Sequence, residues 1–253
     1  MHNFVPSKLN FEIMDYEELN YNALSREQQL ENSQAFPVLM RKVYLWMTLA
    51  LVITGFTSYY VATSPAITSL IFTNKMVFYG LIIAELALVM GVSAAISRLS
   101  LSMATLLFVI YSMINGATLA SIFFVYTESS IVSVFFITAA TFAAMALYGY
   151  FTKKDLSSWG KLLIMALIGL IIASVVNIFI GSSALNLIVS YAGVVIFVGL
   201  TAYDTQKIKE MLLTAPDAGE SMQKMALLGA LSLYLDFINL FLHLLRILGS
   251  SRD

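Results

Sequence analysis

Long uncharged runs fill the chain from residue 41 onward, and their lengths predict membrane-spanning helices. A helix rises ~1.5 Å per residue, so crossing the ~30 Å hydrocarbon core of a bilayer takes about 20 apolar residues. The longest run, residues 162–203, contains 42 residues without a charge, which is enough for two spans. Gly181, Ser182 and Ser183 break this run near its middle. The sequence therefore predicts seven spans, at 43–62, 76–97, 100–125, 131–151, 161–180, 185–206 and 224–248.

The composition agrees with an all-α integral membrane protein. Hydrophobic residues make up 59% of the 253 residues and charged residues 11%, whereas a soluble domain is typically about 25% charged. The net charge of −1 shows no basic excess, so nucleic acid is not expected as a partner. The chain has no cysteine and only two histidines, His2 and His243, which excludes thiolate chemistry and a multi-histidine metal centre. No cofactor motif is present, and we expect neither a tightly bound cofactor nor an enzyme.

Residues 1–38 differ in character from residues 39–253, which hold the transmembrane domain. This first segment carries six acidic residues against two basic ones: Glu12, Asp15, Glu17, Glu18, Glu27 and Glu31 against Lys8 and Arg26. No apolar core of a signal peptide follows a basic start. The segment is interpreted as an acidic, solvated cytoplasmic tail, either a disordered spacer or a docking segment for a partner.

The basic residues predict the orientation of the bundle. Of the 14 lysines and arginines, 11 lie in the N-terminal segment and in alternate loops, whereas the opposite loops contain only Lys75. Cytoplasmic loops are enriched in lysine and arginine, so the N-terminus is expected in the cytoplasm. If the seventh helix crosses fully, the C-terminus lies outside. If that helix is re-entrant, the C-terminus stays inside, and we favour the crossing.

Three ionisable residues, all acids, lie within the predicted spans: Glu85, Asp204 and Asp236. A carboxylate in hydrocarbon costs several kcal/mol, so such groups usually face a cavity or a partner. Along the seventh helix, polar residues recur within an arc of about 80°: Ser232, Asp236, Asn239, His243 and Arg246. Such residues often only join helices through hydrogen bonds. A stripe with Asp, Asn and His instead favours a polar pathway or a proton-sensitive gate.

Two segments carry a resemblance to a known family. Residues 198–208 read VGLTAYDTQKI and residues 229–241 read GALSLYLDFINLF. Both resemble signatures of the Bax inhibitor-1 (transmembrane Bax inhibitor motif) family. The likeness covers residues 38–249 and is to a bacterial-type member of that family. The resemblance implies a seven-helix bundle with helix seven at its centre, enclosed by the other six. The acidic tail matches no functional part of that family.

The resemblance also implies a function, a pH-sensitive calcium leak. Asp204 and Asp236 correspond to its pH-sensing aspartates, Glu85 to its acid on helix two, and Arg98 is the candidate for an arginine that latches onto the pair. Two adjacent carboxylates do not both ionise cheaply, and they titrate as a unit. Because calcium takes six to eight oxygen ligands, the aspartates would hold it weakly and transiently. Glu85, Asn239, Ser232 and His243 would line the ion pathway.

Geometry limits this assignment in two ways. If helix six ends near 213 and helix seven begins near 224, the two aspartates are offset by about three residues, or ~5 Å along the axis. A tighter turn would enlarge the offset. Glu85 and Arg98 are about 140° apart around a straight helix, so they are not expected to share one face.

Two other functions remain open. One is a regulatory membrane protein that binds a protease or a cell-death or stress factor through residues 1–38. The other is an intramembrane aspartyl protease, since Tyr203-Asp204 matches its first motif, but Leu233 to Asp236 lacks the glycines of the second. The expected location is the inner membrane of a bacterium, with a monomer in contact with lipid and calcium ions.

Overall fold

The computed structural model describes residues 7–252, with their side chains from residue 35 onward. Within these residues the helices are α1 (Ser7–Thr63), α2 (Pro65–Phe72), α3 (Lys75–Ala95), α4 (Leu101–Leu119), α5 (Ile122–Val125), α6 (Glu128–Phe151), α7 (Ser157–Ile180), α8 (Ser183–Leu213) and α9 (Glu220–Leu248). The predicted all-α membrane fold is confirmed. Residues 1–6 and the side chains of residues 7–34 lie outside the described part of the chain. The interpretation of residues 1–38 as a solvated acidic tail therefore stays a prediction.

Seven segments are long and apolar enough to cross a membrane, and each contains or closely overlaps one predicted span. They are Ala35–Thr63, Lys75–Ala95, Leu101–Val125, Glu128–Phe151, Ser157–Ile180, Ser183–Leu213 and Glu220–Leu248. The third is not one continuous helix, because it breaks between α4 and α5, where the Ser121 hydroxyl donates to the Thr118 carbonyl at 3.0 Å. A serine hydroxyl that bonds to nearby backbone competes with the helical pattern. The short helix α2 was not expected from the sequence.

Local sequence sets most helix ends. The side chains of Asn74, Ser100, Thr127 and Ser182 each accept a hydrogen bond from a backbone amide of the first turn that follows, which is the usual N-cap arrangement. Gly181 ends α7 in the left-handed conformation at φ 67°, which glycine adopts without steric cost. The predicted break in the long uncharged run at residues 181–183 is therefore confirmed.

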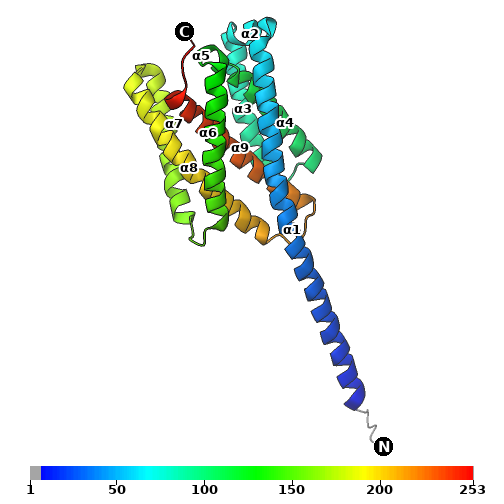
Figure 1. Cartoon of the computed structure of the whole chain (residues 1–253). Coiled ribbons are helices and arrows are strands. Elements are labelled where there is room, and N and C mark those ends of the chain that lie inside the picture. The colour runs from blue at the N-terminus through cyan, green and yellow to red at the C-terminus, as the bar shows by residue number, and fades with distance from the viewer. Residues whose placement is uncertain (1–6, 253) are drawn as a thin grey trace, which may run out of the picture.

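Helix α9 is the centre of the bundle. In its most apolar stretch 67% of the residues are buried, against 6% to 39% in the other six spans. It packs directly on α1, α4, α6 and α8, whereas α3 and α7 pack chiefly on α4 and α8 and form an outer layer (Figure 1). The central position is thus confirmed, although four helices rather than six make the main contacts with α9.

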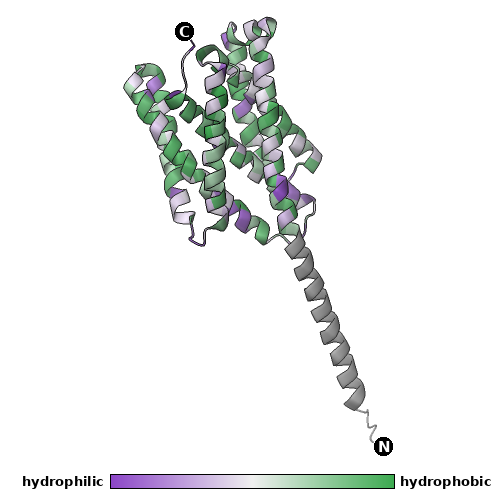
Figure 2. Cartoon of the chain, in the orientation of Figure 1, coloured by the Kyte–Doolittle hydropathy of each residue, from purple (hydrophilic) through white to green (hydrophobic). Residues whose placement is uncertain are grey.

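Hydrophobic residues predominate along the helices of the bundle (Figure 2), and many of them lie on its outer surface. Large side chains such as Phe56, Ile178 and Phe179 are 72%, 79% and 85% exposed, an arrangement that needs lipid as its solvent. Inside, small residues let helices approach closely. A Cβ at Gly149 of α6 would overlap the backbone of Ala202 in α8, and a Cβ at Gly193 of α8 would overlap the His243 ring of α9.

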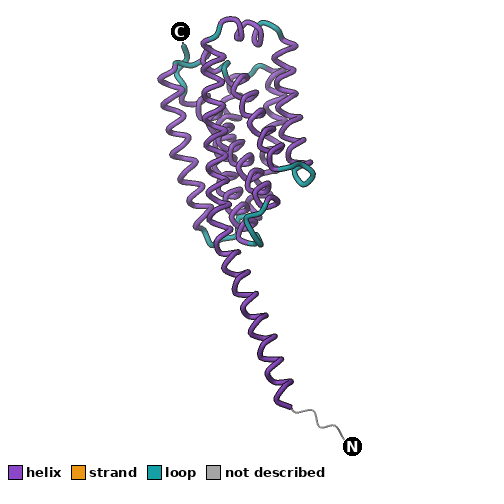
Figure 3. The backbone as a smooth tube through the Cα atoms, turned by 90° about the vertical axis from the view of Figure 1, so that its right-hand side faces the viewer, coloured by secondary structure: helices purple, strands orange, loops and turns teal. Residues whose placement is uncertain are grey.

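The two ends of the bundle are distinct (Figures 1 and 3). Helix α1 extends from one end, which also holds the α6–α7 and α8–α9 connections, and we call it the inner end because the basic residues predict that it faces the cytoplasm. The C-terminus lies at the opposite, outer end. There Ser251 forms a β-bridge with Tyr126, and the Thr127 amide donates to the Ser250 carbonyl at 3.1 Å. Helix α9 therefore runs from one end of the bundle to the other and is not re-entrant.

Candidate functional site

Asp204 of α8 and Ser232 of α9 meet where these two helices pack in the inner half of the bundle. The Ser232 hydroxyl donates to Asp204 Oδ2 at 2.5 Å. Asp236 follows Ser232 by four residues, so it lies on the same face of α9, one turn nearer the outer end. The site is therefore a row of three polar side chains in which Ser232 is the direct partner of Asp204.

The register of α8 and α9 explains why serine takes this place. Helix α8 ends at Leu213, the end assumed in the estimate of the offset, but α9 begins at Glu220 rather than near residue 224. Counted from these ends, Asp204 lies nine residues along α8, Ser232 twelve and Asp236 sixteen along α9. The offset between the aspartates grows from three residues to seven, or about 10 Å for parallel axes. The tighter turn thus brings Ser232 nearest to the level of Asp204.

Asp236 is more buried than Asp204 and is only 5% exposed. Its Oδ2 atom is buried and has no hydrogen-bond partner among the described residues. The Asp204 carboxyl lies within electrostatic range of it. A buried polar atom without a partner costs free energy, so the Asp236 carboxyl is a high-energy group when charged and a natural place for a proton or a cation.

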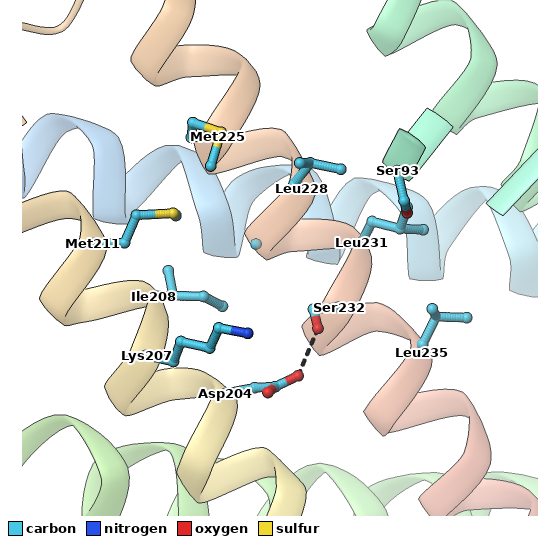
Figure 4. Close-up of a pocket in the computed structure, with 11 residues that line it drawn as sticks. Ser93, Asp204, Lys207, Ile208, Met211, Met225, Leu228, Leu231, Ser232 and Leu235 are labelled. Carbon is cyan, nitrogen blue, oxygen red and sulfur yellow. Dashed lines mark hydrogen bonds between the residues drawn. The ribbon is translucent and has the colours of Figure 1, made fainter. Parts of the chain in front are cut away.

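A cavity of about 290 Å³ opens beside Asp204 (Figure 4). Asp204 and Ser232 point into it together with Lys207, while Ser93 enters from α3 and the remaining wall is apolar. Asp236 is not part of the lining. The cavity therefore reaches Asp204, and its wall extends to Leu235, the residue before Asp236, without including Asp236 itself.

Lys207 is a site residue that the sequence analysis missed. It follows Asp204 by three positions on α8, and its ammonium lies within electrostatic range of the Asp204 carboxyl and 5.8 Å from the centre of the Tyr203 ring. The spacing of an acid and a base at i and i+3 on one helix is the signal that was available.

Arg98, the candidate latch, is not brought to the aspartates. It lies in the turn after α3, where its side chain is exposed and its amide donates to the Ala95 carbonyl at 2.8 Å. No hydrogen bond or ion pair joins Arg98 to Asp204 or Asp236 within the described residues. In this arrangement Lys207, rather than Arg98, is the basic group beside Asp204.

Glu85 belongs to a second polar network. Its carboxylate accepts hydrogen bonds from the Thr118 hydroxyl at 2.6 Å and, more weakly, from the Asn115 amide at 3.4 Å. Asn115 Oδ1 in turn accepts from the Tyr234 hydroxyl at 3.0 Å, and that hydroxyl is 2.6 Å from Thr54 Oγ1. Tyr234 and Asp236 lie about 200° apart around α9, so the structure does not place Glu85 with the aspartates.

This network joins α1, α3, α4 and α9, and of its members only Glu85 was identified from the sequence. Asn115 and Thr118 are polar residues within a mostly apolar run, which was the available signal. Tyr234 is fully buried at 0% exposure. A buried tyrosine hydroxyl usually has a partner, and here that partner ties the central helix to its neighbours.

In the outer half of the bundle, the polar stripe of α9 faces α8 at His243. His243 is buried against Gly193, stacks on the Phe197 ring with centroids 5.7 Å apart, and leaves its Nδ1 atom without a partner among the described residues. Asn239 donates to the Leu235 carbonyl of its own helix at 2.8 Å. Near the outer end, the exposed Arg246 lines a second polar cavity of about 380 Å³.

The oxygen atoms here supply only part of a calcium shell. Asp204, Asp236 and Ser232 offer at most five side-chain oxygens, whereas calcium takes six to eight ligands. Within the described residues no three or more His, Cys, Asp or Glu side chains gather as a metal site. The arrangement is therefore suited to protonation and to weak, hydrated cation binding.

Comparison with known proteins agrees with the two signature segments. Residues 37–253 match the profile of the family described as "Inhibitor of apoptosis-promoting Bax1". Inner membrane protein YbhL of Escherichia coli K12 is 54% identical over 215 residues, which cover 84% of this chain and 92% of YbhL. A protein of Borreliella burgdorferi is 47% identical over 214 residues, covering 85% and 92% of the two chains. A membrane protein of Streptococcus pyogenes is 39% identical over 210 residues, covering 82% and 90%. The chain is therefore a multi-pass membrane protein that belongs to the Bax inhibitor-1 family.

Proposed function

We propose that this protein is a calcium leak channel of the bacterial inner membrane that is gated by protonation of Asp204 and Asp236. The observation that carries the proposal is the placement of the two acids. Asp204 lines a cavity in the inner half of the bundle, and Asp236, one turn of α9 after Ser232, is buried outside this lining with an unpartnered oxygen. A short extension of the cavity past Leu235 would bring it to this second acid in the central helix.

In the proposed closed state, at least Asp236 is protonated. Asp204 then accepts from Ser232, and Asp236 carries no charge that needs solvation. When both carboxylates are charged, they repel each other, because they lie within electrostatic range in a medium of low dielectric. Loss of the proton therefore drives α8 and α9 apart near Ser232 and extends the cavity towards Asp236. The charged groups that bear on this step are Asp204 and Lys207 on α8 and Asp236 on α9.

Beyond Asp236, the stripe of Asn239 and His243 offers the path towards the outer cavity beside Arg246. Calcium would pass with part of its water shell, since the side chains complete only part of its coordination. This favours transit over storage and requires neither a tightly bound cofactor nor a catalytic step. A protease would need both aspartates on one water molecule, and the interposed Ser232 speaks against that use.

The deciding experiment measures calcium flux into liposomes that contain the purified full-length protein, across pH 6–8. We expect the wild-type flux to rise with pH. Asp236→Asn and Asp204→Asn remove the titrating groups and should flatten that rise. Glu210→Gln is the matched control because Glu210 is an exposed carboxylate on α8. Absence of pH-dependent flux, or an unchanged profile in Asp236→Asn, would refute the proposal.

The same assay decides which base acts on the pair. Lys207→Gln removes the cation beside Asp204 and should shift the midpoint of the pH profile. Arg98→Gln should leave the closed state unchanged and alter the flux at high pH only if Arg98 approaches the charged pair in the open state. Equal profiles for both variants and the wild type would exclude a basic latch.

A second candidate function is regulation of another membrane protein through the N-terminal segment. Helix α1 begins at Ser7, well before its membrane-spanning part at Ala35, and the family match begins only at residue 37. Removing residues 1–34 keeps the whole span. A variant that loses its effect in cells but keeps full calcium flux in liposomes would favour the regulatory function.

A further inference from the structure

A groove runs along the side of the bundle between α1 and α6. Both helices pack on α8 and α9, and α9 passes behind the space between them (Figure 1). The inner part of the groove is a cavity of about 680 Å³ lined by residues of α1 and α6, with Phe237 of α9 at its floor. The small side chains of Ala139, Ala143 and Ala146 leave space on the α6 side of this cavity. The groove therefore faces the bilayer laterally and reaches in to the central helix.

The groove continues towards the outer end of the bundle. A second cavity of about 320 Å³ lies beside the first and shares Leu51, Phe135 and Phe237 with it. Together they extend from Pro37 at the inner end to Ile122 near the outer end. The lining is mostly apolar and aromatic, which suits a hydrocarbon occupant. The exception is Ser58 of the outer cavity, whose buried Oγ has no hydrogen-bond partner among the described residues.

The surroundings of the groove favour a lipid chain as its apolar occupant. A single acyl chain is slender and flexible, and the bilayer supplies it at high concentration beside the open face of the groove.

The inner mouth of the groove carries a free cation. Arg41 lines the inner cavity, its side chain is exposed, and it has no hydrogen-bond or ion-pair partner among the described residues. The neighbouring Lys42 is engaged, since its ammonium donates to Gln223 Oε1 at 2.6 Å. A guanidinium binds phosphate through paired hydrogen bonds. The mouth is thus cationic where an inner-leaflet headgroup would lie, and the body of the groove is apolar where its chain would lie.

We propose that the α1–α6 groove binds one acyl chain of an anionic phospholipid from the inner leaflet, with Arg41 in contact with its phosphate. The aromatic floor at Phe237 makes this lipid a direct neighbour of the central helix. The site is separate from the cavity at Asp204, which lies between α3, α8 and α9.

Photocrosslinking of the full-length protein in nanodiscs tests the site. The probe is phosphatidylglycerol with a diazirine in its acyl chain, and adducts are mapped by mass spectrometry of peptides. We expect adducts to concentrate on the facing walls of α1 and α6. Ala143→Phe fills the groove and should lower that yield about tenfold, equivalent to about 1.4 kcal/mol. Ala144→Phe is the matched control, because Ala144 is also exposed on α6 but does not line the groove.

The outcomes separate the occupants. Adducts spread evenly over lipid-facing residues such as Ile178 and Phe179, or an equal loss in both alanine variants, would overturn the proposal. A photoreactive amino acid at position 143 that joins to another polypeptide in cells, and not to lipid, would also overturn it. Wild-type thermal stability of Ala143→Phe in detergent excludes misfolding as the cause of a lower yield.

The headgroup is tested by competition. In wild type, unlabelled phosphatidylglycerol should displace the probe better than phosphatidylcholine. Arg41→Gln should reduce that preference about fivefold, as expected for one basic residue near an anionic headgroup, while Lys161→Gln, an exposed cation on α7, should not. Soluble glycerol phosphate should not compete. Competition by glycerol phosphate, or an unchanged preference in Arg41→Gln, would refute the assignment of Arg41 to a lipid phosphate.

Discussion

Removal of the Tyr234 hydroxyl should measurably loosen the central helix. In Tyr234→Phe the ring stays and keeps its edge-to-face contacts with Phe108 and Tyr111, whose centroids both lie 5.9 Å away. The hydroxyl that is lost donates its one hydrogen to Asn115 Oδ1 at 3.0 Å. It also lies 2.6 Å from Thr54 Oγ1, whose single hydrogen is shared between this hydroxyl and the Ser112 carbonyl. The perturbation therefore isolates the polar link between α9 and helices α1 and α4.

The magnitude follows from what each partner retains. Thr54 keeps its bond to the Ser112 carbonyl at 2.9 Å, whereas Asn115 Oδ1 loses the partner that Tyr234 supplies. Interhelical hydrogen bonds in membrane bundles average about 0.6 kcal/mol, and an unsatisfied buried acceptor costs about 1–3 kcal/mol. A loss of about 1–3 kcal/mol corresponds to a fall in Tm of roughly 2–10 °C for a chain of this size.

Thermal unfolding in detergent, followed by circular dichroism, measures this change. Tyr191→Phe is the matched control, because Tyr191 lies on α8 and is 55% exposed. Equal melting temperatures for the two variants would show that the hydroxyl of Tyr234 contributes nothing and would refute the network as a tie between helices.

Three further predictions concern packing, topology and pH. Gly149→Ala should destabilise the bundle by about 1–3 kcal/mol, because its Cβ overlaps the backbone of α8, whereas Gly169→Ala meets nothing within 4 Å and should be tolerated in the same unfolding assay. The chain has no cysteine, so Ser251→Cys should react with an impermeant maleimide added outside cells and Ser158→Cys only after permeabilisation; the reverse pattern would invert the orientation. Hydrogen bonds from the hydroxyl and amide of the serine two residues later hold the pKa of Asp155 below its usual range. The contribution of these hydrogen bonds to the free energy of unfolding should be complete above about pH 4 and should be lost as pH falls below that value. Unfolding measured against pH should no longer show this loss in Asp155→Asn.

The spans were predictable because the thickness of a bilayer fixes how much apolar helix is needed. The ends of the helices were less predictable, because a helix can continue beyond the membrane into water. Helix α8 continues past the predicted residue 206 to Leu213 and carries Lys207 and Lys209 on the extension. Only local signals such as the caps at Ser100 and Ser182 fix an end to the residue.

The site was predictable in composition but not in arrangement. Asp204 and Asp236 were identified because charges are rare within spans, and Ser232 because it belongs to the polar stripe of the seventh helix. The structure places all three along the α8–α9 contact. Periodicity gives the face of each helix, yet it says nothing of the axial register between two helices. That register places Ser232, and not Asp236, against Asp204. The same limit hid the separation of Glu85 from the aspartates.

The two polar faces of α9 would act differently in the proposed gating. One face meets Asp204 on α8, while the opposite face is tied through Tyr234 to α1 and α4. A repulsion between α8 and α9 would therefore displace α8, because the hydrogen bonds of Tyr234 tie α9 to α1 and α4 on its opposite face. If the proposed gating holds, weakening this tie by Tyr234→Phe should let α9 move as well and raise calcium flux at pH 6, where the proposed channel is expected to be closed. Flux at pH 6 that stays at the wild-type level in a folded Tyr234→Phe protein would mean that α9 does not take part in the opening movement.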